Sequence, residues 1–293
     1  MQIESLKVFC DLIDTGSFTK AAQINGVTQS AVSQQMTALE RIFKSRLVER
    51  SKLQLRLTPE GRVVYESSKQ IVGLYRAVDH EIQDLKDIVS GTIELATIYS
   101  IGLHDLPPYL KRFMQTYPTV QVHVGYRSCQ KVYEDVLGNA ADIGLIAYPV
   151  KDARLEIVPL RKEPLVLVCS PEHPFAQMKA IQFKALAGQK FISFEPDTPT
   201  RQALDKILKA ERVQVEHVME FDNVETVKRA VEIGAGISFV PESTVAQELE
   251  KQTLVTVEIQ NGQFYRPIAA IYKKNRVLSP ALKQFLAILK TGT

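Results

Sequence analysis

The stretch from Thr28 to Phe43, TQSAVSQQMTALERIF, is rich in short uncharged side chains that form hydrogen bonds. Gln pairs bidentately with adenine, and Ser and Thr reach several base edges in the major groove of DNA. A Lys would instead add affinity for any sequence by contacting phosphates. The polar face of this predicted helix therefore suits the reading of bases. Its members are Gln29, Ser30, Ser33, Gln34 and Thr37.

The opposite face of this helix carries Val32, Met36, Leu39 and Phe43 at helical spacing, and we expect this stripe in a hydrophobic core. The alternative interpretation of the polar face is an ordinary solvated surface. The residues around the helix bear on the choice between these two interpretations.

Features before this helix complete a helix-turn-helix. Residues 18–25, FTKAAQIN, form a short helix, Gly26 provides the turn, and Thr28 caps the next helix. Ala22 lies four residues before the glycine and lets the two helices cross closely, while Val32 lies six residues after it and packs beneath. This spacing favours DNA binding.

Residues 46–58, RLVERSKLQLRLT, alternate apolar and polar side chains, which predicts a short β-hairpin. Such a hairpin would be the wing of a winged helix. Arg50 and Arg56 are placed to contact phosphate or the minor groove, although a single Arg is often simply solvated.

The positive charge of the chain is concentrated in the same segment. Residues 1–58 hold eight Lys or Arg and five Asp or Glu, and this excess of three equals the formal net charge of all 293 residues. The remainder of the chain therefore balances. A local basic excess is typical of a small module that faces a polyanion, and chance fluctuation is the alternative.

The composition argues against several other classes. No stretch approaches the roughly 20 apolar residues that span a membrane, and the acidic N-terminus is unlike a signal peptide, so we expect a cytoplasmic protein. The three cysteines are widely spaced and the five histidines are scattered, so neither disulfides nor a metal site is expected. There is no GxSxG, P-loop or GxGxxG motif and no acid–base pair, so we expect neither an enzyme nor a cofactor.

A long helix follows the wing. Thr58, Pro59 and Glu60 form a strong helix start, because a hydroxyl cap precedes Pro and a carboxylate in the first turn. Apolar positions then recur in steps of four and three, the heptad pattern of a coiled coil, which predicts dimerisation. Packing of the helix on its own domain is the alternative. The seam consists of Val64, Ser68, Ile71, Tyr75, Val78, Ile82, Leu85 and Val89.

From Thr92 onward, strand-like and helical segments alternate, which predicts a mostly parallel sheet with helices on both faces. About 200 residues is generous for one such sheet, so two lobes are expected. The fold class is therefore α+β and α/β, in more than one domain.

This combination resembles the LysR-type family of transcriptional regulators. FCDLIDTGSFTKAAQINGVTQSAVSQQMTALERIF and the later LRLTPEG are similar to the N-terminal signature of the family, and the similarity continues through GTIELATIYS, VGYRSCQKVYEDVLGNAADIGLIAY and VKRAVEIGAGISFVPES. It covers essentially the whole chain. The sequence departs from the family at Asn25, Ser30, Gln34 and Val48, where Leu, Pro, Arg and Phe are usual.

The resemblance implies a winged helix-turn-helix, a long linker helix and a two-lobed α/β effector domain like a periplasmic binding protein. Two crossover strands, near Leu160–Pro164 and Arg266–Ile268, would join the lobes. The implied boundaries are 1–58 for the DNA-binding domain, 59–90 for the linker and dimerisation helix, and 91–293 for the effector-binding domain, with lobe I at 91–161 and 267–293 and lobe II at 162–266.

Ligands of open α/β sheets bind beyond the carboxyl ends of the strands, where helix N-termini present free N–H groups. Hydroxyls and one Arg at such positions suit a carboxylate or a similar small anion. Each hydroxyl alone is equally well explained as a helix cap, and the cysteine of the set as a small buried hydrophobe rather than a redox sensor. The resemblance assigns the effector cleft to Ser100, Ile101, Ser128, Cys129, Thr198, Thr200, Arg201 and Asn223.

These features together predict a sequence-specific DNA-binding transcriptional regulator that a small anionic effector controls. Its partners would be promoter DNA, the effector and further copies of the chain, in a dimer through the linker helix and, as the resemblance implies, a homotetramer. A solute-binding protein with a fortuitous N-terminal extension and a two-lobed enzyme fragment are the rival hypotheses. The basic helix-turn-helix argues against the first, and the missing acid–base pair argues against the second.

Overall fold

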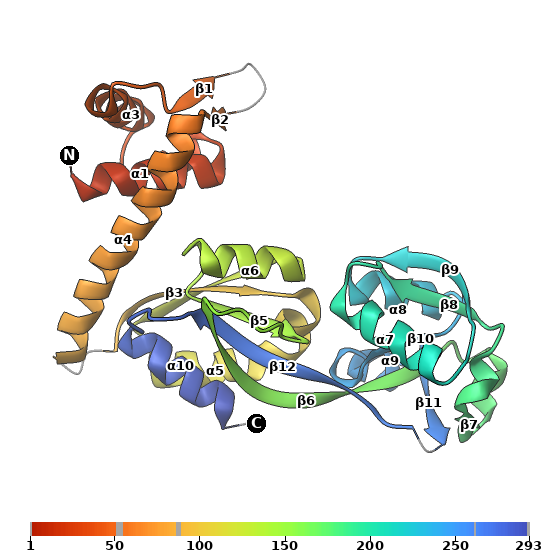
Figure 1. Cartoon of the computed structure of the whole chain (residues 1–293). Coiled ribbons are helices and arrows are strands. Elements are labelled where there is room, and N and C mark those ends of the chain that lie inside the picture. Colours follow the sequence, from red (N-terminus) through yellow and green to blue (C-terminus); the bar gives the residue numbers. More distant parts are fainter. Residues whose placement is uncertain (1, 51–54, 86–88, 261, 292–293) are drawn as a thin grey trace. The chain divides into compact units, whose positions relative to one another are not determined.

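The structure, a computed structural model, divides into two compact units (Figure 1). Residues 1–88 and 277–279 form the first unit, and residues 89–276 and 280–293 form the second. Each unit contains its own cluster of buried apolar side chains. The described residues are 2–50, 55–85, 89–260 and 262–291.

The first unit is a helix-turn-helix with a β-hairpin wing and a long helix. The side chains of Ser17 and Thr28 accept backbone N–H groups and cap the second and third helices. Gly26, in the turn, has a φ of +63°, a left-handed conformation that favours glycine. The predicted turn and cap are therefore confirmed. The elements are α1 (Ile3–Thr15), α2 (Phe18–Ile24), α3 (Gln29–Phe43), β1 (Val48–Arg50), β2 (Leu55–Leu57) and α4 (Pro59–Leu85).

The core of this unit lies between α1, α2 and α3. Phe9 and Val32 are fully buried, and the small Ala22 is 5% exposed at the crossing of the helices. Asn25, where the LysR-type pattern has Leu, donates its side-chain N–H to the Asp11 carboxylate at 2.7 Å. A polar contact between α1 and the end of α2 therefore stands where a leucine would give an apolar one.

Strands and helices alternate in the second unit, as predicted. The strands are β3 (Gly91–Thr97), β4 (Val120–Tyr126), β5 (Ile143–Ala147), β6 (Leu155–Cys169), β7 (Ala180–Gln182), β8 (Lys190–Phe194), β9 (Glu216–Phe221), β10 (Ser238–Pro241), β11 (Val255–Gln260) and β12 (Phe264–Lys273). The helices are η1 (Ile101–Asp105), α5 (Leu106–Thr116), α6 (Cys129–Leu137), η2 (Pro174–Gln177), η3 (Phe183–Leu186), α7 (Pro199–Ala210), α8 (Val224–Glu232), η4 (Glu242–Thr244), α9 (Ala246–Glu250) and α10 (Pro280–Lys290).

The larger sheet is mixed. Its strand order is β4-β3-β5-β12-β6-β11-β7, with β10 also paired to β6, and a second sheet contains β8 and β9. The pairs β3–β4, β3–β5, β8–β9 and β7–β11 are parallel, whereas β6 and β12 run antiparallel to each other and also to β5, β10 and β11. The prediction of a mostly parallel sheet is therefore wrong, because the two longest strands reverse direction relative to several neighbours.

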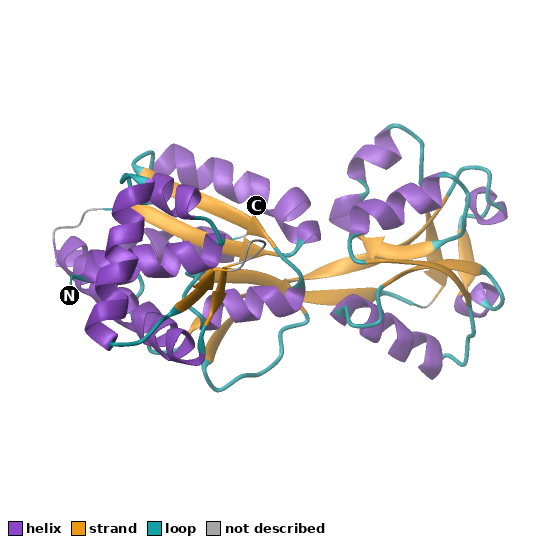
Figure 2. Ribbon diagram, turned by 90° about the horizontal axis from the view of Figure 1, so that it is seen from above, coloured by secondary structure: helices purple, strands orange, loops and turns teal. Residues whose placement is uncertain are grey.

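The strands β6 and β12 join two lobes (Figure 2). Lobe I contains β3, β4, β5, α5, α6 and α10, and lobe II contains β7 to β11 with α7, α8 and α9 (Figure 1). The predicted crossovers lie within these two strands. However, β6 begins at Leu155, five residues before the predicted crossover near Leu160–Pro164. Charged residues such as Arg161 and Glu163 interrupt the apolar run, so the sequence pattern underestimates the length of β6.

Consecutive residues of β6 are buried on opposite faces of the sheet. Leu167 and Cys169 belong to the cluster beneath α7, whereas Val168 belongs to the cluster beneath α8. A strand covered on both faces has a continuous apolar sequence rather than an alternating one. This explains the continuous apolar run from Leu165 to Cys169.

Gly61, in the first turn of α4, has no room for a side chain. A Cβ atom there would lie 1.9 Å from the backbone oxygen of Leu47. Backbone cannot yield as a flexible side chain would, so Gly61→Ala should lower the free energy of unfolding by about 1–3 kcal/mol in urea denaturation. The exposed neighbour Arg62 offers a control, because Arg62→Ala should change stability by less than about 0.5 kcal/mol. Equal effects of the two variants would contradict this explanation.

Candidate DNA interface and effector cleft

The face of α3 that points away from the core carries the predicted base-reading side chains. Four of these five side chains are exposed and Ser33 is half-buried. Residues on this face border a shallow hollow of about 320 Å³. The hollow is lined by Ser33, Gln34, Thr37, Ala38 and Arg41.

Hydrogen bonds within α3 orient two of its hydroxyl groups. The Thr37 hydroxyl donates to the carbonyl oxygen of Ser33 at 3.0 Å, and the hydroxyls of Thr28 and Ser30 lie 2.9 Å apart. Once its proton is committed, the Thr37 oxygen still has lone pairs to accept a hydrogen bond. It therefore suits a donor on a base edge, such as the amino group of adenine or cytosine.

One residue of the predicted core stripe lies elsewhere. Val32, Met36 and Leu39 are almost fully buried, but Phe43 is 39% exposed. Phe43 is the last residue of α3, and Lys44 follows it with a φ of +50°. The prediction that Phe43 belongs to the core is therefore wrong, because the helix ends before another turn can cover its ring.

The wing forms as predicted, with β1 and β2 paired antiparallel. Arg56 is exposed on β2 and lies opposite Glu49 of β1 in the register. Arg50 is the last residue of β1, but its side chain lies outside the described part of the structure, as do residues 51–54 at the predicted tip. Of the two predicted arginines, Arg56 therefore lies on the surface of the wing.

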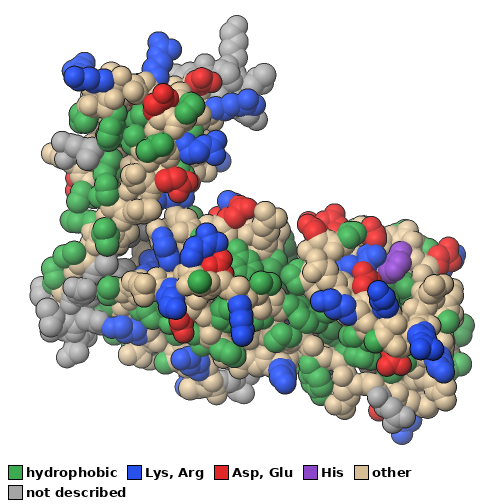
Figure 3. All heavy atoms as spheres, viewed as in Figure 1, with side chains coloured by type: hydrophobic (Ala, Val, Ile, Leu, Met, Phe, Trp, Pro, Cys, Tyr) green, Lys and Arg blue, Asp and Glu red, His purple; other side chains and the backbone are tan. Residues whose placement is uncertain are grey.

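The helix α4 uses its apolar residues in two ways. Near its start, Val64 packs against the core of the first unit, and Ser68 and Val72 are buried. From Ile71 onward, large apolar side chains are exposed, and Figure 3 shows hydrophobic groups along the helix labelled α4 in Figure 1. The exposed set comprises Ile71, Leu74, Tyr75, Val78 and Ile82.

The end of the predicted seam differs from the prediction. The helix is described as far as Leu85, and Val89, the last residue of the predicted seam, is not helical. The side chain of Leu85 and residues 86–88 lie outside the described part. The two alternatives for this helix therefore apply to different stretches: Val64, Ser68 and Val72 pack within the unit, and the turns after Val72 expose an apolar seam.

Three helix N-termini border one cavity of about 190 Å³ in the second unit. The side chains of Ser128, Thr198 and Asn223 cap α6, α7 and α8 by accepting backbone N–H groups. One of these helices belongs to lobe I and two belong to lobe II, so the cavity lies between the lobes. Helix N-termini carry partial positive charge and unpaired N–H groups, and together they favour a bound anion.

The structure gathers most of the predicted effector residues at this cavity but excludes two. Ile101 is buried within η1, and Arg201 turns its guanidinium to Asp205 and Glu220, at 2.9 and 2.8 Å. Neither borders the cavity. The predicted residues that do border it are Ser100, Ser128, Cys129, Thr198, Thr200 and Asn223.

Two other arginines, which are not among the predicted effector residues, border the cavity. Arg127 directly follows β4 and donates to Asp135 at 2.9 Å. Arg266 lies in the middle of β12 and is 1% exposed. Ser100 was predicted because ligands bind beyond the carboxyl ends of strands, and the same reasoning applies to Arg127. For Arg266, the sequence feature that could have indicated a role is a charged residue within an otherwise apolar strand.

Cys129 is the first residue of α6 and is half-buried at the cavity. Burial raises the pKa of its thiol to about 11. The thiolate is the reactive form, and only a small fraction of this thiol is ionised near neutral pH. The position is therefore poorly suited to redox sensing.

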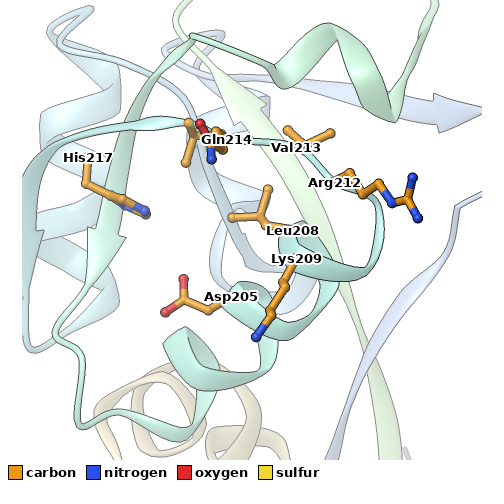
Figure 4. Close-up of a pocket in the computed structure, with 8 residues that line it drawn as sticks. Asp205, Leu208, Lys209, Arg212, Val213, Gln214 and His217 are labelled. Atoms are coloured by element: carbon orange, nitrogen blue, oxygen red, sulfur yellow. The ribbon is translucent and has the colours of Figure 1, made fainter.

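A second hollow, of about 520 Å³, lies beside the C-terminal end of α7 (Figure 4). Asp205, Lys209, Arg212 and His217 are among its residues. Arg212 extends away from Asp205 and His217, so these groups do not converge on one point. The Nδ1 atom of His217 also lies 2.5 Å from the Ser193 hydroxyl. The hollow lacks the capped helix N-termini of the cavity between the lobes.

The described residues contain no group of three or more His, Cys, Asp or Glu side chains that is arranged to hold a metal ion. Among the described helices, none combines the length and apolar content needed to cross a bilayer.

Two family models match the chain in the order of the two units. A model described as bacterial regulatory helix-turn-helix protein, lysR family, matches residues 3–62. A model described as LysR substrate binding domain matches residues 86–293. The HTH-type transcriptional regulator CysL of Bacillus subtilis is 28% identical over 292 residues, with 100% of this chain and 98% of that protein covered.

Solved structures show the same fold. Full-length CbnR, solved with its target DNA, is 20% identical and has a TM-score of 0.71, with 100% of both chains covered. The regulatory domain of CcmR from Synechocystis PCC6803, solved in complex with 2-PG, is 25% identical and has a TM-score of 0.64. That comparison covers 69% of this chain and 97% of the other.

Replacing Ser33 and Gln34 together with alanine should reduce discrimination between DNA sequences. Each good base contact contributes about 1–3 kcal/mol of discrimination, so the ratio of specific to nonspecific affinity should fall at least about tenfold. The measurement is a mobility shift with DNA from upstream of the gene and with a scrambled version of it. Glu4→Ala, at an exposed position of α1, should leave the ratio unchanged. An unchanged ratio in the double variant would reject the assignment of this face.

Val78→Glu should weaken self-association through α4 by at least about tenfold, because pairing would bury an unpaired carboxylate. Analytical ultracentrifugation over a range of concentrations measures the shift toward monomer. Glu66→Arg is a control with an equally large change, since Glu66 is exposed but lies about 120° around the helix from Val78. If Val78→Glu associated as tightly as the unmodified chain, the exposed seam would not be the dimer contact.

Proposed function

The chain belongs to the LysR family of transcriptional regulators, and from that membership we propose that it reads promoter DNA through α3 and its wing and responds to a small anion held between its two lobes. It is a DNA-binding transcriptional regulator and not an enzyme. The site of action is then the cytoplasm, where the DNA lies.

The DNA-binding face consists of the polar side of α3 and the arginines of the wing. The exposure of Gln34 and Thr37 beside a hollow supports base contacts from this side. Arg50 and Arg56 would contact phosphates or the minor groove and so position the helix. The DNA complex of CbnR supports this function by analogy of fold.

The working molecule is a dimer joined through α4, and two dimers assemble into a tetramer. The exposed apolar seam from Ile71 to Ile82 supports the dimer. Paired heads would then read half-sites separated by about one helical turn of DNA or a multiple of it. The functional boundaries are 1–58 for DNA binding, 59–90 for the linker and 91–293 for the effector domain, and the division between compact units after residue 88 supports them.

The convergence of three capped helix N-termini on one cavity is the observation that carries the effector site. Ser100 and Thr200 add hydroxyl groups to the same cavity. The complex of the CcmR regulatory domain with 2-PG supports a small ligand in this class of domain. Such a ligand regulates only by binding one arrangement of the lobes better than another.

Ser100→Ala and Thr200→Ala should each abolish the rise in melting temperature that a bound anion causes, because each removes a hydroxyl donor at the cavity. The measurement is a thermal shift with inorganic phosphate, sulfate and a panel of short carboxylates. Thr116→Ala removes an exposed hydroxyl at the end of α5 and should leave the shift intact. Shifts that survive in both cavity variants would reject the site.

A further inference from the structure

An ion pair is buried where the two crossover strands pass each other. Arg266 of β12 lies opposite Glu163 of β6 in the register, and its Nε donates to the Glu163 carboxylate at 2.5 Å. The two residues are 1% and 4% exposed. Buried charges persist only when they are paired and hydrogen-bonded, so this pair is held firmly in place.

The guanidinium of Arg266 has one unused end, and that end is buried. Nη1 donates to the Ser100 hydroxyl at 2.9 Å, whereas Nη2 has no hydrogen-bond partner in the described part of the chain. Arg266 also borders the cavity between the lobes. A buried donor that lacks a partner is costly, and a ligand that supplies an acceptor removes that cost.

We infer that Arg266 is the residue that binds the anionic group of the effector, through Nη2. This inference rests on the proposed effector site and names its charged anchor. Nε and Nη1 are already committed to Glu163 and Ser100, so the guanidinium is oriented before the ligand arrives. Preorganised donors bind more tightly, because little side-chain entropy is lost on binding.

The same network reaches both lobes. Ser100 follows β3 of lobe I, while Ser243 of η4 in lobe II donates to the other oxygen of Glu163. An anion at Nη2 competes with Glu163 for the positive charge of Arg266. Ligand binding therefore changes the strength of a contact that links the two lobes.

The remaining charges of the cavity restrict the ligand further. Glu195, Asp197 and Asp222 border it from lobe II, and Arg127 borders it from lobe I. Carboxylates only accept hydrogen bonds when ionised, so they favour a ligand that also carries hydroxyl or ammonium donors. The predicted ligand class is a small hydroxy acid, amino acid or similar anion of low net charge.

The test measures the affinity of the full-length protein for two- to six-carbon hydroxy acids and amino acids, each hydroxy acid alongside its neutral amide, by titration calorimetry. The unmodified chain should bind at least one acid, and the amide of a bound hydroxy acid should bind at least about tenfold more weakly, because the charge-assisted hydrogen bond is lost.

Arg266→Gln alone leaves the Glu163 carboxylate buried without its cationic partner and so risks unfolding. The double variant Glu163→Gln with Arg266→Gln removes both charges together and should fold while losing at least about tenfold in affinity for the acid. Glu163→Gln alone removes the competing carboxylate and should bind the acid as tightly as the unmodified chain or more tightly. If the pair had a purely structural role, both the double variant and Glu163→Gln alone would bind the acid more weakly than the unmodified chain.

Lys162→Gln is the matched control. Lys162 lies on the same crossover strand, but it is exposed and does not border the cavity, so the affinity of this variant should stay within about twofold of the unmodified chain. Retained affinity in the folded double variant would overturn the role of Arg266 while leaving the effector cavity intact. If no anion bound the unmodified chain, the proposed anionic effector and this inference would both fall.

Discussion

The antiparallel pairing of β6 with β12 is the constraint on which the effector domain depends. All ten residues of β12 are paired with β6 in the register, and both lobes attach to these two strands. Any change in the angle between the lobes must therefore be absorbed by this ladder. A register shift between Ile268 and Ala269 lies close to the midpoint, and irregularities of this kind let a strand bend and twist. The ladder also fixes Glu163 opposite Arg266, so the hinge and the charged pair share one location.

The helix α4 also has two roles, because its first turns pack on the winged head and its later turns expose an apolar seam. A straight α-helix drifts by about 20° per heptad relative to a strict seven-residue repeat, so one seam cannot face the same direction throughout. Val64 and Ser68 turn toward the core of their own unit, while Val78 and Ile82 are exposed. The winged head is thereby fixed to the start of the helix, and the later turns remain available to a second copy. One continuous helix can therefore transmit an orientation from the paired seam to the head.

The sequence predicted those features whose causes are local. Thr28, Ser128, Thr198 and Asn223 were recognisable because each accepts an N–H only three residues further along the chain. Arg201 was selected by the same local rule, yet its guanidinium turns to Glu220 on a neighbouring strand. The pair of Glu163 and Arg266 joins positions 103 residues apart and depends on the strand register, which no local pattern encodes. Mixed strand direction was missed for the same reason.

The geometry of the cavity also explains how a small ligand can change the preferred arrangement of the lobes. Moving an equilibrium from 1:99 to 99:1 requires a difference in affinity of about 10⁴-fold, or about 5.5 kcal/mol. A hydrogen bond to a charged group contributes about 1.5–3 kcal/mol, and a partly buried helix N-terminus contributes up to about 2 kcal/mol. The N-terminus of α6 comes from lobe I and those of α7 and α8 come from lobe II. Only an arrangement that brings them together allows all of these interactions with one ligand, so the interactions that the separated lobes cannot make at the same time contribute the difference in affinity.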